Sequence, residues 1–311
     1  MMLQVTILIL SIVALYFGAE LALEAAEKIG LYFGLSPLVI GLLLIGFGTS
    51  LPEFFVSQLS AYRGQTDIAM GNILGSNIAN LFLILGISGL LAPIHIIRRE
   101  ITKQLIYHII LTTCLGASLF FLGVGIASTV LFAAFFAFYL WVTFSEMKKQ
   151  RSVRVVSDED DHEVNELTFI VFVKLVIGFV LLFFGGEFLV SSGTFIAKAI
   201  GVSAYVISAI FVAFGTSFPE LVTALIASWK KKNTDLIIGN IIGSNIFNVA
   251  FVLGSIGFYD VGTSGDYRVE FYAICGAAYF LLFLNLIKKN FTIIPGIIFL
   301  STYIGMVIYW I

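Results

Sequence analysis

The sequence predicts an all-α membrane protein with ten transmembrane helices. They are arranged as two five-helix repeats of inverted topology, with broken helices near the middle of the membrane. Three observations predict this fold. The 311 residues are 59% hydrophobic and only 12% charged, whereas soluble domains carry about 25% charged residues. Ten apolar stretches can each cross a bilayer, and a segment of the first half recurs in the second half.

The predicted spans are apolar stretches of about 20 residues, the length of helix that crosses the hydrocarbon core. They are 3–26, 37–62, 68–92, 103–124, 126–145, 168–193, 203–228, 234–258, 267–287 and 292–311. The first stretch lacks a positively charged leader and is too long for a signal peptide, so we expect it to remain as a span. Cys114 and Cys275 lie in apolar runs without disulfide or metal-ligand spacing.

One polar segment, "EMKKQRSVRVVSDEDDHEVNE" at 146–166, divides the spans five and five. We expect 1–145 and 168–311 to be the two repeats and 146–167 to be a linker. Most of the 17 Lys and Arg residues fall in loops that share one side of the membrane with this linker, while the opposite loops keep Arg63, Lys198 and Arg268. Because Lys and Arg concentrate on the cytoplasmic side, we expect a multi-pass cell-membrane protein with a cytoplasmic linker and both termini outside.

An internal repeat joins the two halves. The segment 44–86, "LIGFGTSLPEFFVSQLSAYRGQTDIAMGNILGSNIANLFLILG", aligns with 211–254, "FVAFGTSFPELVTALIASWKKKNTDLIIGNIIGSNIFNVAFVLG". The offset is 167 residues, becoming 168 after one inserted residue. Since each repeat has an odd number of spans, the second copy enters the membrane from the opposite side. Inverted halves of this kind are typical of secondary transporters with a site near the midplane.

The repeated "FGTS.PE" segments predict broken helices. Pro52 has no N–H, so the carbonyl of Gly48 loses its helical partner, and Pro219 does the same to Gly215. A freed carbonyl is tolerated at membrane depth only beside protein or a polar cavity. A bound cation would satisfy such carbonyls.

Oxygen-bearing side chains accompany each break. Residues four apart share a helix face, which pairs Thr49 with Glu53, Thr216 with Glu220, Ser76 with Asn80, and Ser244 with Asn248. Oxygen donors without thiolate or imidazole favour Ca²⁺ or Na⁺ over zinc or copper. Two carboxylates are neutralised by one Ca²⁺ or by two or more Na⁺. Because intramembrane carboxylates are costly, their duplication predicts a midplane ion site.

The whole ten-span plan resembles the sodium/calcium exchanger branch of the cation/calcium exchangers, whose two alpha repeats look like "GFGTSLPE … GNILGSNIANLFLILG" and "AFGTSFPE … GNIIGSNIFNVAFVLG". The resemblance implies that Glu53 and Glu220 are central Ca²⁺ ligands, joined by the carbonyls of Thr49 and Thr216. It also implies flanking Na⁺ sites and residues at their centre. The flanking sites would involve Ser50 with Ser76, Ser217 with Ser244, and the carbonyl of Ala213 or its counterpart Gly46. Asn80 and Asn248 would lie at the middle of the sites.

Asn248 departs from the family pattern, because many of these exchangers have Asp at this point. An amide removes a potential charge, so we expect no K⁺ co-transport. Three Na⁺ per Ca²⁺ would move one net charge in each cycle, and two Na⁺ per Ca²⁺ would move none.

The resemblance therefore implies an antiporter that exchanges Na⁺ for Ca²⁺ by alternating access. Spans one and six, which carry Glu20 and Glu187, would move past a core of spans two, three, seven and eight. A H⁺/Ca²⁺ antiporter using the same carboxylates is the alternative. An enzyme is not expected, since a nucleophile with its base, or a pair of deep aspartates, is missing from the spans.

Other polar residues have simpler interpretations. Structural hydrogen bonding between helices is the alternative role for the serines and asparagines. The acidic run from Asp158 to Asp161 is better explained as a solvated linker than as a calcium sensor, since it lacks EF-hand spacing. We expect no cofactor and no obligatory protein partner, and the net charge of −2 provides no basic surface for nucleic acid. The expected partners are the transported Na⁺ and Ca²⁺ and the lipid bilayer.

Overall fold

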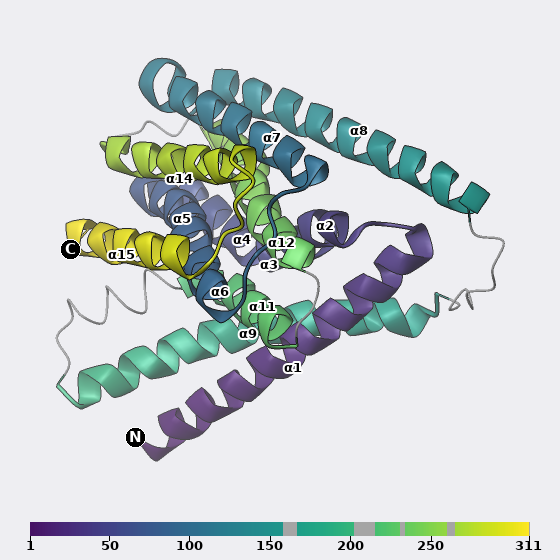
Figure 1. The fold of residues 1–311 in the computed structure, drawn as a ribbon. Helices are drawn as coiled ribbons and strands as arrows, with labels where there is room; N and C mark the ends of the chain where they lie inside the picture. The colour runs from purple at the N-terminus through teal and green to yellow at the C-terminus, as the bar shows by residue number, and fades with distance from the viewer. Residues whose placement is uncertain (158–166, 202–214, 231–233, 260–264, 311) are drawn as a thin grey trace.

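A computed structural model describes residues 1–157, 167–201, 215–230, 234–259 and 265–310. Regular structure in these ranges is helical (Figure 1), apart from one isolated β-bridge between Ile94 and Phe291. Eight helices in the described ranges are long and apolar enough to cross a membrane, and a bent helix pair forms a ninth candidate span. The predicted all-α membrane fold is confirmed.

The helices of the first half follow the predicted spans. They are α1 (Met2–Phe33), α2 (Pro37–Val39), the π-helical η1 (Ile40–Ile45), α3 (Gly46–Thr49), α4 (Leu51–Tyr62), α5 (Thr66–Ile78), the π-helical η2 (Ala79–Ile84), α6 (Leu85–Leu91), α7 (Arg99–Ala117), the π-helical η3 (Ser118–Leu122) and α8 (Ile126–Ser157).

The second half repeats this order as far as it is described. Its helices are α9 (Phe169–Ala199), the 3-10 turn η5 (Gly215–Ser217), α11 (Phe218–Trp229), α12 (Thr234–Phe247), the π-helical η6 (Asn248–Leu253), α13 (Gly254–Ile256), the 3-10 turn η7 (Gly257–Tyr259), α14 (Arg268–Leu286) and α15 (Ile293–Trp310).

Helix α8 extends beyond the predicted span. It reaches Ser157, well into the segment from 146 that we expected to be linker. The residues after the apolar stretch, "EMKKQR", are strong helix formers. Helical propensity therefore continues the helix where hydrophobicity alone predicts its end.

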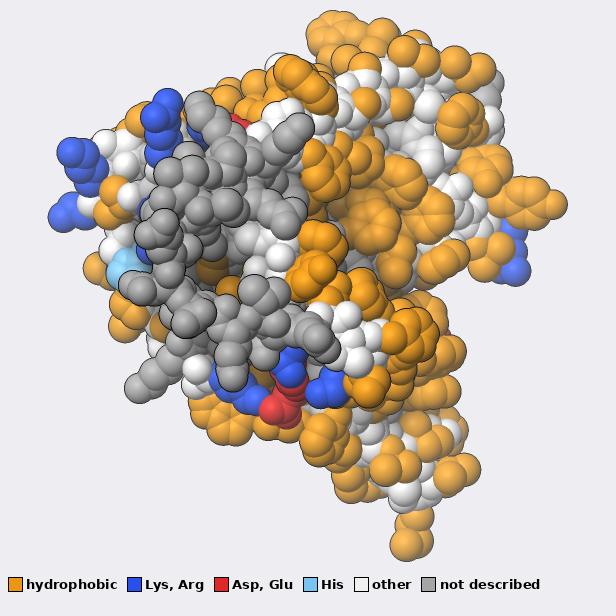
Figure 2. Space-filling model, turned by 90° about the vertical axis from the view of Figure 1, so that its right-hand side faces the viewer, with side chains coloured by type: hydrophobic (Ala, Val, Ile, Leu, Met, Phe, Trp, Pro, Cys, Tyr) orange, Lys and Arg blue, Asp and Glu red, His pale blue; other side chains and the backbone are white. Residues whose placement is uncertain are grey.

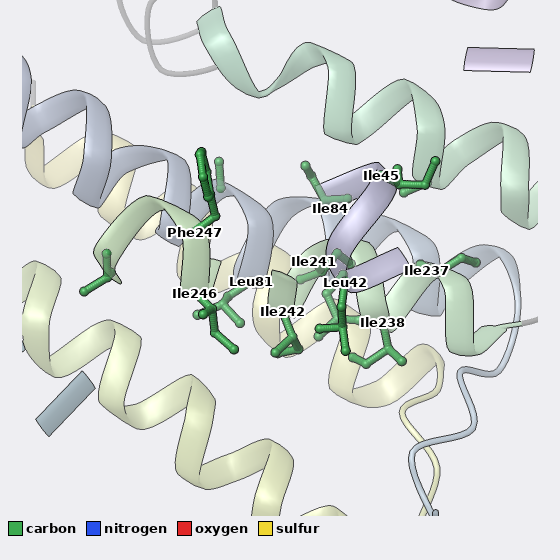
Figure 3. Close-up of a cluster of buried hydrophobic side chains, with 14 of the residues drawn as sticks. Leu42, Ile45, Leu81, Ile84, Ile237, Ile238, Ile241, Ile242, Ile246 and Phe247 are labelled. Carbon is green, nitrogen blue, oxygen red and sulfur yellow. The ribbon is translucent and has the colours of Figure 1, made fainter. Parts of the chain in front are cut away.

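The helices that carry the repeated motifs form the centre of the molecule. In the most apolar stretch of Thr234–Tyr259, 94% of the residues are buried, compared with 22% in Met2–Phe33. Figure 3 shows isoleucines of α12 packed with Leu42 and Ile45 of η1 and with Leu81 and Ile84 of η2. These elements come from both halves, so one shared core holds the two repeats together.

Helices α1 and α9 pack against each other at the edge of this core, where they cross in Figure 1. Small residues let the two backbones approach closely. A Cβ on Gly18 would lie 2.9 Å from the backbone nitrogen of Leu182, and one on Gly178 would lie 2.7 Å from that of Ala22.

The outer surface is apolar. Hydrophobic side chains cover most of the described surface visible in Figure 2, while Lys and Arg side chains stand in small groups. Large exposed side chains include Phe17, Trp141 and Tyr272, each more than half exposed. Such a surface is stable only against lipid, in agreement with the predicted spans.

Candidate functional site

Both broken helices have the same local geometry. The chain bends by 42° between Pro37–Thr49 and Leu51–Tyr62. Ser50 at this break has φ −87° and ψ 6°, and Ser217 at the equivalent point has φ −84° and ψ 6°. Pro52 and Pro219 follow within the first turns of α4 and α11, where a missing N–H costs nothing. The breaks predicted from the two prolines are therefore present.

Each break places a carboxyl group inside the protein. Glu53 and Glu220 occupy the first turns of α4 and α11, where the positive end of a helix favours an anion. Both side chains have no exposed surface, and they are close enough for their charges to repel. Among the described residues, neither oxygen of Glu53 and only Oε1 of Glu220 has a hydrogen-bond partner. Two buried, nearly unpaired carboxyl groups form the centre of the site.

Hydroxyl groups from both halves surround these carboxyls. Ser50 Oγ donates to Glu220 Oε1 at 3.0 Å. Ser244 Oγ lies 3.5 Å from the same oxygen and donates to the carbonyl of Gly46 at 3.1 Å. Ser76 Oγ lies 3.2 Å from Thr216 Oγ1, beside Glu53. The predicted hydroxyls therefore gather here, but Ser50 and Ser76 lie beside different carboxyls.

The remaining predicted residues take less regular positions. Thr49 is buried, and its hydroxyl hydrogen is shared between the carbonyl of Ile45 at 3.0 Å and Asn240 Oδ1 at 3.4 Å. Ser217 is buried at the end of η5. The segment containing Ala213 lies outside the described residues.

Asn80 and Asn248 differ although their positions are equivalent in the repeats. Asn80 Nδ2 donates to Asn245 Oδ1 at 3.0 Å, and its own Oδ1 has no partner in the described structure. Asn248 is fully buried, and neither of its polar atoms bonds a described residue. Both asparagines lie in the π-helical elements η2 and η6, and such elements often occur at functional sites.

Three further asparagines contact the site and are absent from our sequence prediction. Asn72 and Asn240 bond the threonines at the breaks, and Asn245 bonds Asn80. All belong to the repeated segments "GNILGSN" and "GNIIGSN". The repeat itself was the signal that could have found them.

All the donor atoms that the site offers to a cation are oxygens. They belong to carboxylate, hydroxyl, amide and carbonyl groups, which suit Na⁺ and Ca²⁺. Within the described residues, no group of three or more His, Cys, Asp or Glu side chains could hold a metal ion. The site combines two carboxylates with neutral oxygens, which are ligands that hard cations prefer.

Comparison with known proteins decides the family. A model of the family described as "Sodium/calcium exchanger protein" matches residues 3–145 and 170–311. The chain belongs to the sodium/calcium exchanger family. The match covers both halves of this exchanger and leaves out the charged segment between them. It confirms the resemblance seen in the two repeated motifs.

Relatives extend over most of the exchanger. The inner membrane protein YrbG of Escherichia coli is 33% identical over 82% of this chain and 79% of its own length. The putative antiporter CaxA of Alkalimonas amylolytica is 33% identical over 98% of both chains. The sodium/calcium exchanger MaX1 of Methanosarcina acetivorans is 28% identical over 81% of this chain and 82% of its own.

A solved structure has the same fold. The sodium-calcium exchanger NCX_Mj, soaked with Na⁺ and Sr²⁺, superimposes with a TM-score of 0.82 at 28% identity and covers 97% of both chains. With the family match, this similarity makes the exchanger a membrane antiporter and not an enzyme, as predicted.

Proposed function

We propose that this exchanger moves Ca²⁺ in one direction and Na⁺ in the other by alternating access. The observation that carries the proposal is the pair of buried carboxyl groups, Glu53 and Glu220, contributed by opposite halves and surrounded by oxygen donors. Placing two negative charges in a protein interior is costly unless cations neutralise them. The site therefore favours occupied states, which is what coupled exchange requires.

In this proposal Ca²⁺ binds between the two glutamates and the carbonyls of Thr49 and Thr216. Na⁺ occupies flanking positions that use the same carboxylates with Ser50, Ser76, Ser217 and Ser244. Asn80 and Asn248 face the centre, and Gly46 and Ala213 offer carbonyls. Because Ca²⁺ requires six to eight oxygens, the ions compete for shared ligands and cannot all be bound together.

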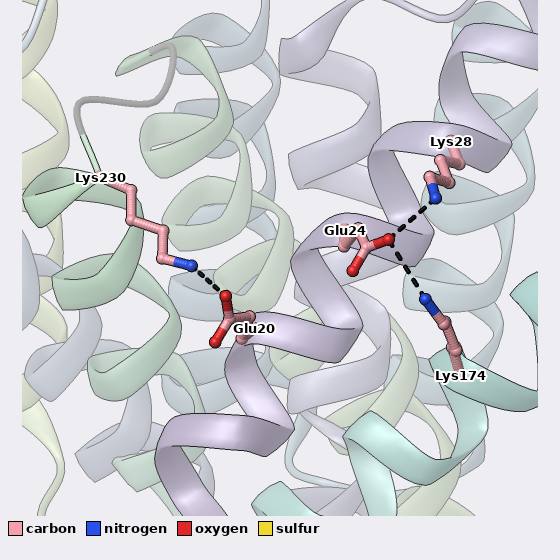
Figure 4. Close-up of polar contacts among 5 residues, drawn as sticks. All are labelled: Glu20, Glu24, Lys28, Lys174 and Lys230. Carbon is pink, nitrogen blue, oxygen red and sulfur yellow. Dashed lines mark hydrogen bonds and ion pairs between the residues drawn. The ribbon is translucent and has the colours of Figure 1, made fainter.

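Helices α1 and α9 are the proposed moving elements. They pack chiefly on each other and expose much of their surface, whereas α12 is enclosed. Figure 4 shows the ion pairs of this region: Lys230 at the end of α11 binds Glu20, and Glu24 accepts from Lys28 at 2.9 Å and Lys174 at 3.3 Å. These exposed pairs are weak, so they allow movement.

The proposed orientation places both termini outside and the segment 146–167 in the cytoplasm. Its support is the distribution of Lys and Arg among the loops, which concentrates on the side of this segment. With this orientation, Lys230 and Glu20 meet on the cytoplasmic side of the site.

The coupling ion is tested by Ca²⁺ uptake into proteoliposomes loaded with Na⁺, K⁺ or acid, with protein-free vesicles as the control. We expect rapid uptake only when an outward Na⁺ gradient is present. Uptake driven by the pH gradient and indifferent to Na⁺ would contradict the proposal and support H⁺/Ca²⁺ exchange instead.

We expect K⁺ to have no role in transport. Asn248 adds no charge to the site, so the charge balance depends on the two glutamates. Replacing K⁺ by choline on both sides of Na⁺-loaded vesicles should leave the initial rate of Ca²⁺ uptake unchanged. A rate that requires K⁺ on the Ca²⁺ side would contradict this prediction.

A further inference from the structure

Asn72 joins the two halves next to the site. Its Nδ2 donates to the carbonyl of Glu53 at 3.1 Å and to Ser57 Oγ at 2.9 Å, both on α4 of its own half. Its Oδ1 accepts from Thr216 Oγ1 of the opposite half at 3.0 Å. A carbonyl can only accept, so the NH₂ group must face Glu53 and the oxygen must face Thr216.

Asn240, the equivalent residue of the second repeat, makes the corresponding connection. Its Nδ2 donates to Thr223 Oγ1 on α11 at 3.1 Å, and its Oδ1 lies 3.4 Å from Thr49 Oγ1. Thr223 gives its own hydrogen to the carbonyls of Pro219 and Glu220, each 2.9 Å away. Its oxygen is therefore the acceptor, which orients the amide of Asn240 in the same sense as that of Asn72.

The orientation of Asn72 determines where the hydroxyl hydrogens point. Thr216 has one hydroxyl hydrogen and gives it to Asn72 Oδ1. In the contact between Ser76 and Thr216, at 3.2 Å, Ser76 must then be the donor. The hydrogen of Ser76 is thereby directed to Thr216 Oγ1, so the lone pairs of Ser76 Oγ are available to a cation.

We propose that Asn72 and Asn240 are positioning residues for cation binding. Each one fixes the distance between a glutamate-bearing helix of one half and the threonine at the break of the other half. Asn72 also orients hydroxyl hydrogens so that oxygen lone pairs face the ion. Neither residue touches the ion itself. This inference rests on the proposed function, since it concerns the affinity of the same site.

The expected effect of Asn72→Ala is on affinity. The KM for Ca²⁺ should rise by about tenfold or more, because buried hydrogen bonds that orient ligands are lost. The maximal rate should stay within about twofold, since the carboxylates that drive the cycle remain. Asn240→Ala should have the same effect and provides the test if the first variant does not fold.

Asn285→Ala is the matched control. Asn285 is a buried amide of α14 that bonds Thr102 and the carbonyl of Ile96, away from the two carboxylates. Its loss should lower the melting temperature without changing the KM. Equal KM values for the wild type and both site variants would overturn the inference, as would a fall in the maximal rate without a change in KM.

Double-mutant cycles test the crossed pattern of contacts. Asn72→Ala should be coupled to Thr216→Val and additive with Thr49→Val, whereas Asn240→Ala should show the reverse. Coupling of either asparagine to both threonines alike would mean a general structural role and would overturn the inference. If wild-type vesicles show no Na⁺-driven uptake, the proposed function fails. If they do and the variants match them, only this inference fails.

Discussion

Replacing either Glu53 or Glu220 with glutamine is expected to abolish Na⁺-driven Ca²⁺ uptake. Glutamine preserves the shape of the side chain but leaves one carboxylate to balance a divalent cation in a fully buried site. Removing one partner of a buried charge pair costs about 3 kcal/mol or more, which corresponds to about a 100-fold loss of affinity. Initial uptake rates and Ca²⁺ titration by calorimetry measure the two effects.

Asp266→Asn is the control for this experiment. Asp266 is an exposed acid that pairs with Arg268 at the surface, so its loss should leave uptake unchanged. Folding of each variant is checked by its melting temperature. A folded Glu53→Gln variant that still exchanges Na⁺ for Ca²⁺ at the wild-type rate would contradict the assigned role of that carboxylate.

Gly243→Val is expected to destabilise the whole assembly. A Cβ at Gly243 would lie 2.7 Å from the Cα of Leu42 and 2.9 Å from its carbonyl carbon. The neighbouring atoms are backbone, so they cannot move aside as a side-chain tip can. Overpacking costs about 1–3 kcal/mol even where side chains can adjust, and each kcal/mol lowers the melting temperature of a domain of this kind by roughly 2–4 °C.

A matched substitution separates this effect from the general cost of removing a helical glycine. Gly276 of α14 is exposed, and a Cβ there would meet no other atom within 4 Å. Gly276→Val should therefore keep the wild-type melting temperature in detergent, while Gly243→Val lowers it by several degrees. Similar melting temperatures for the two variants would show that α12 and η1 can separate without loss of stability.

The sequence predicts the membrane spans and the helix breaks because both depend on local chemistry. Hydrophobic length determines where a helix can cross lipid, and Pro52 and Pro219 cannot supply the missing N–H groups. The π-helical elements at 40–45, 79–84, 118–122 and 248–253 were not predicted. Their sequences are as apolar as their surroundings, and hydrophobicity does not distinguish a π-helical turn from an α-helical one.

The residues that gather around the two carboxyl groups were easier to predict than the hydrogen bonds between them. Glu53 and Glu220 stand out because carboxylates are rare inside membranes. That Ser50 bonds Glu220, and that Ser76 meets Thr216, depends on how the two halves interdigitate. Spacing along one chain segment cannot show contacts between residues about 140 to 170 positions apart. The contacts of the asparagines at 72 and 240 with the threonines of the opposite half could not be predicted for the same reason.

The two halves differ in one ion pair. Glu20 binds Lys230, but no ion pair among the described residues joins Glu187 to Arg63, although the repeat makes these positions equivalent. Helix α1 packs along α11, while α9 has no comparable contact with α4. The same motif therefore has two conformations in one molecule. The conformation of each half shows what the other half would adopt if the two were exchanged. If the two halves exchange conformations, the pair between Glu20 and Lys230 would separate as a pair between Glu187 and Arg63 forms. The bound cations would then decide which side is open.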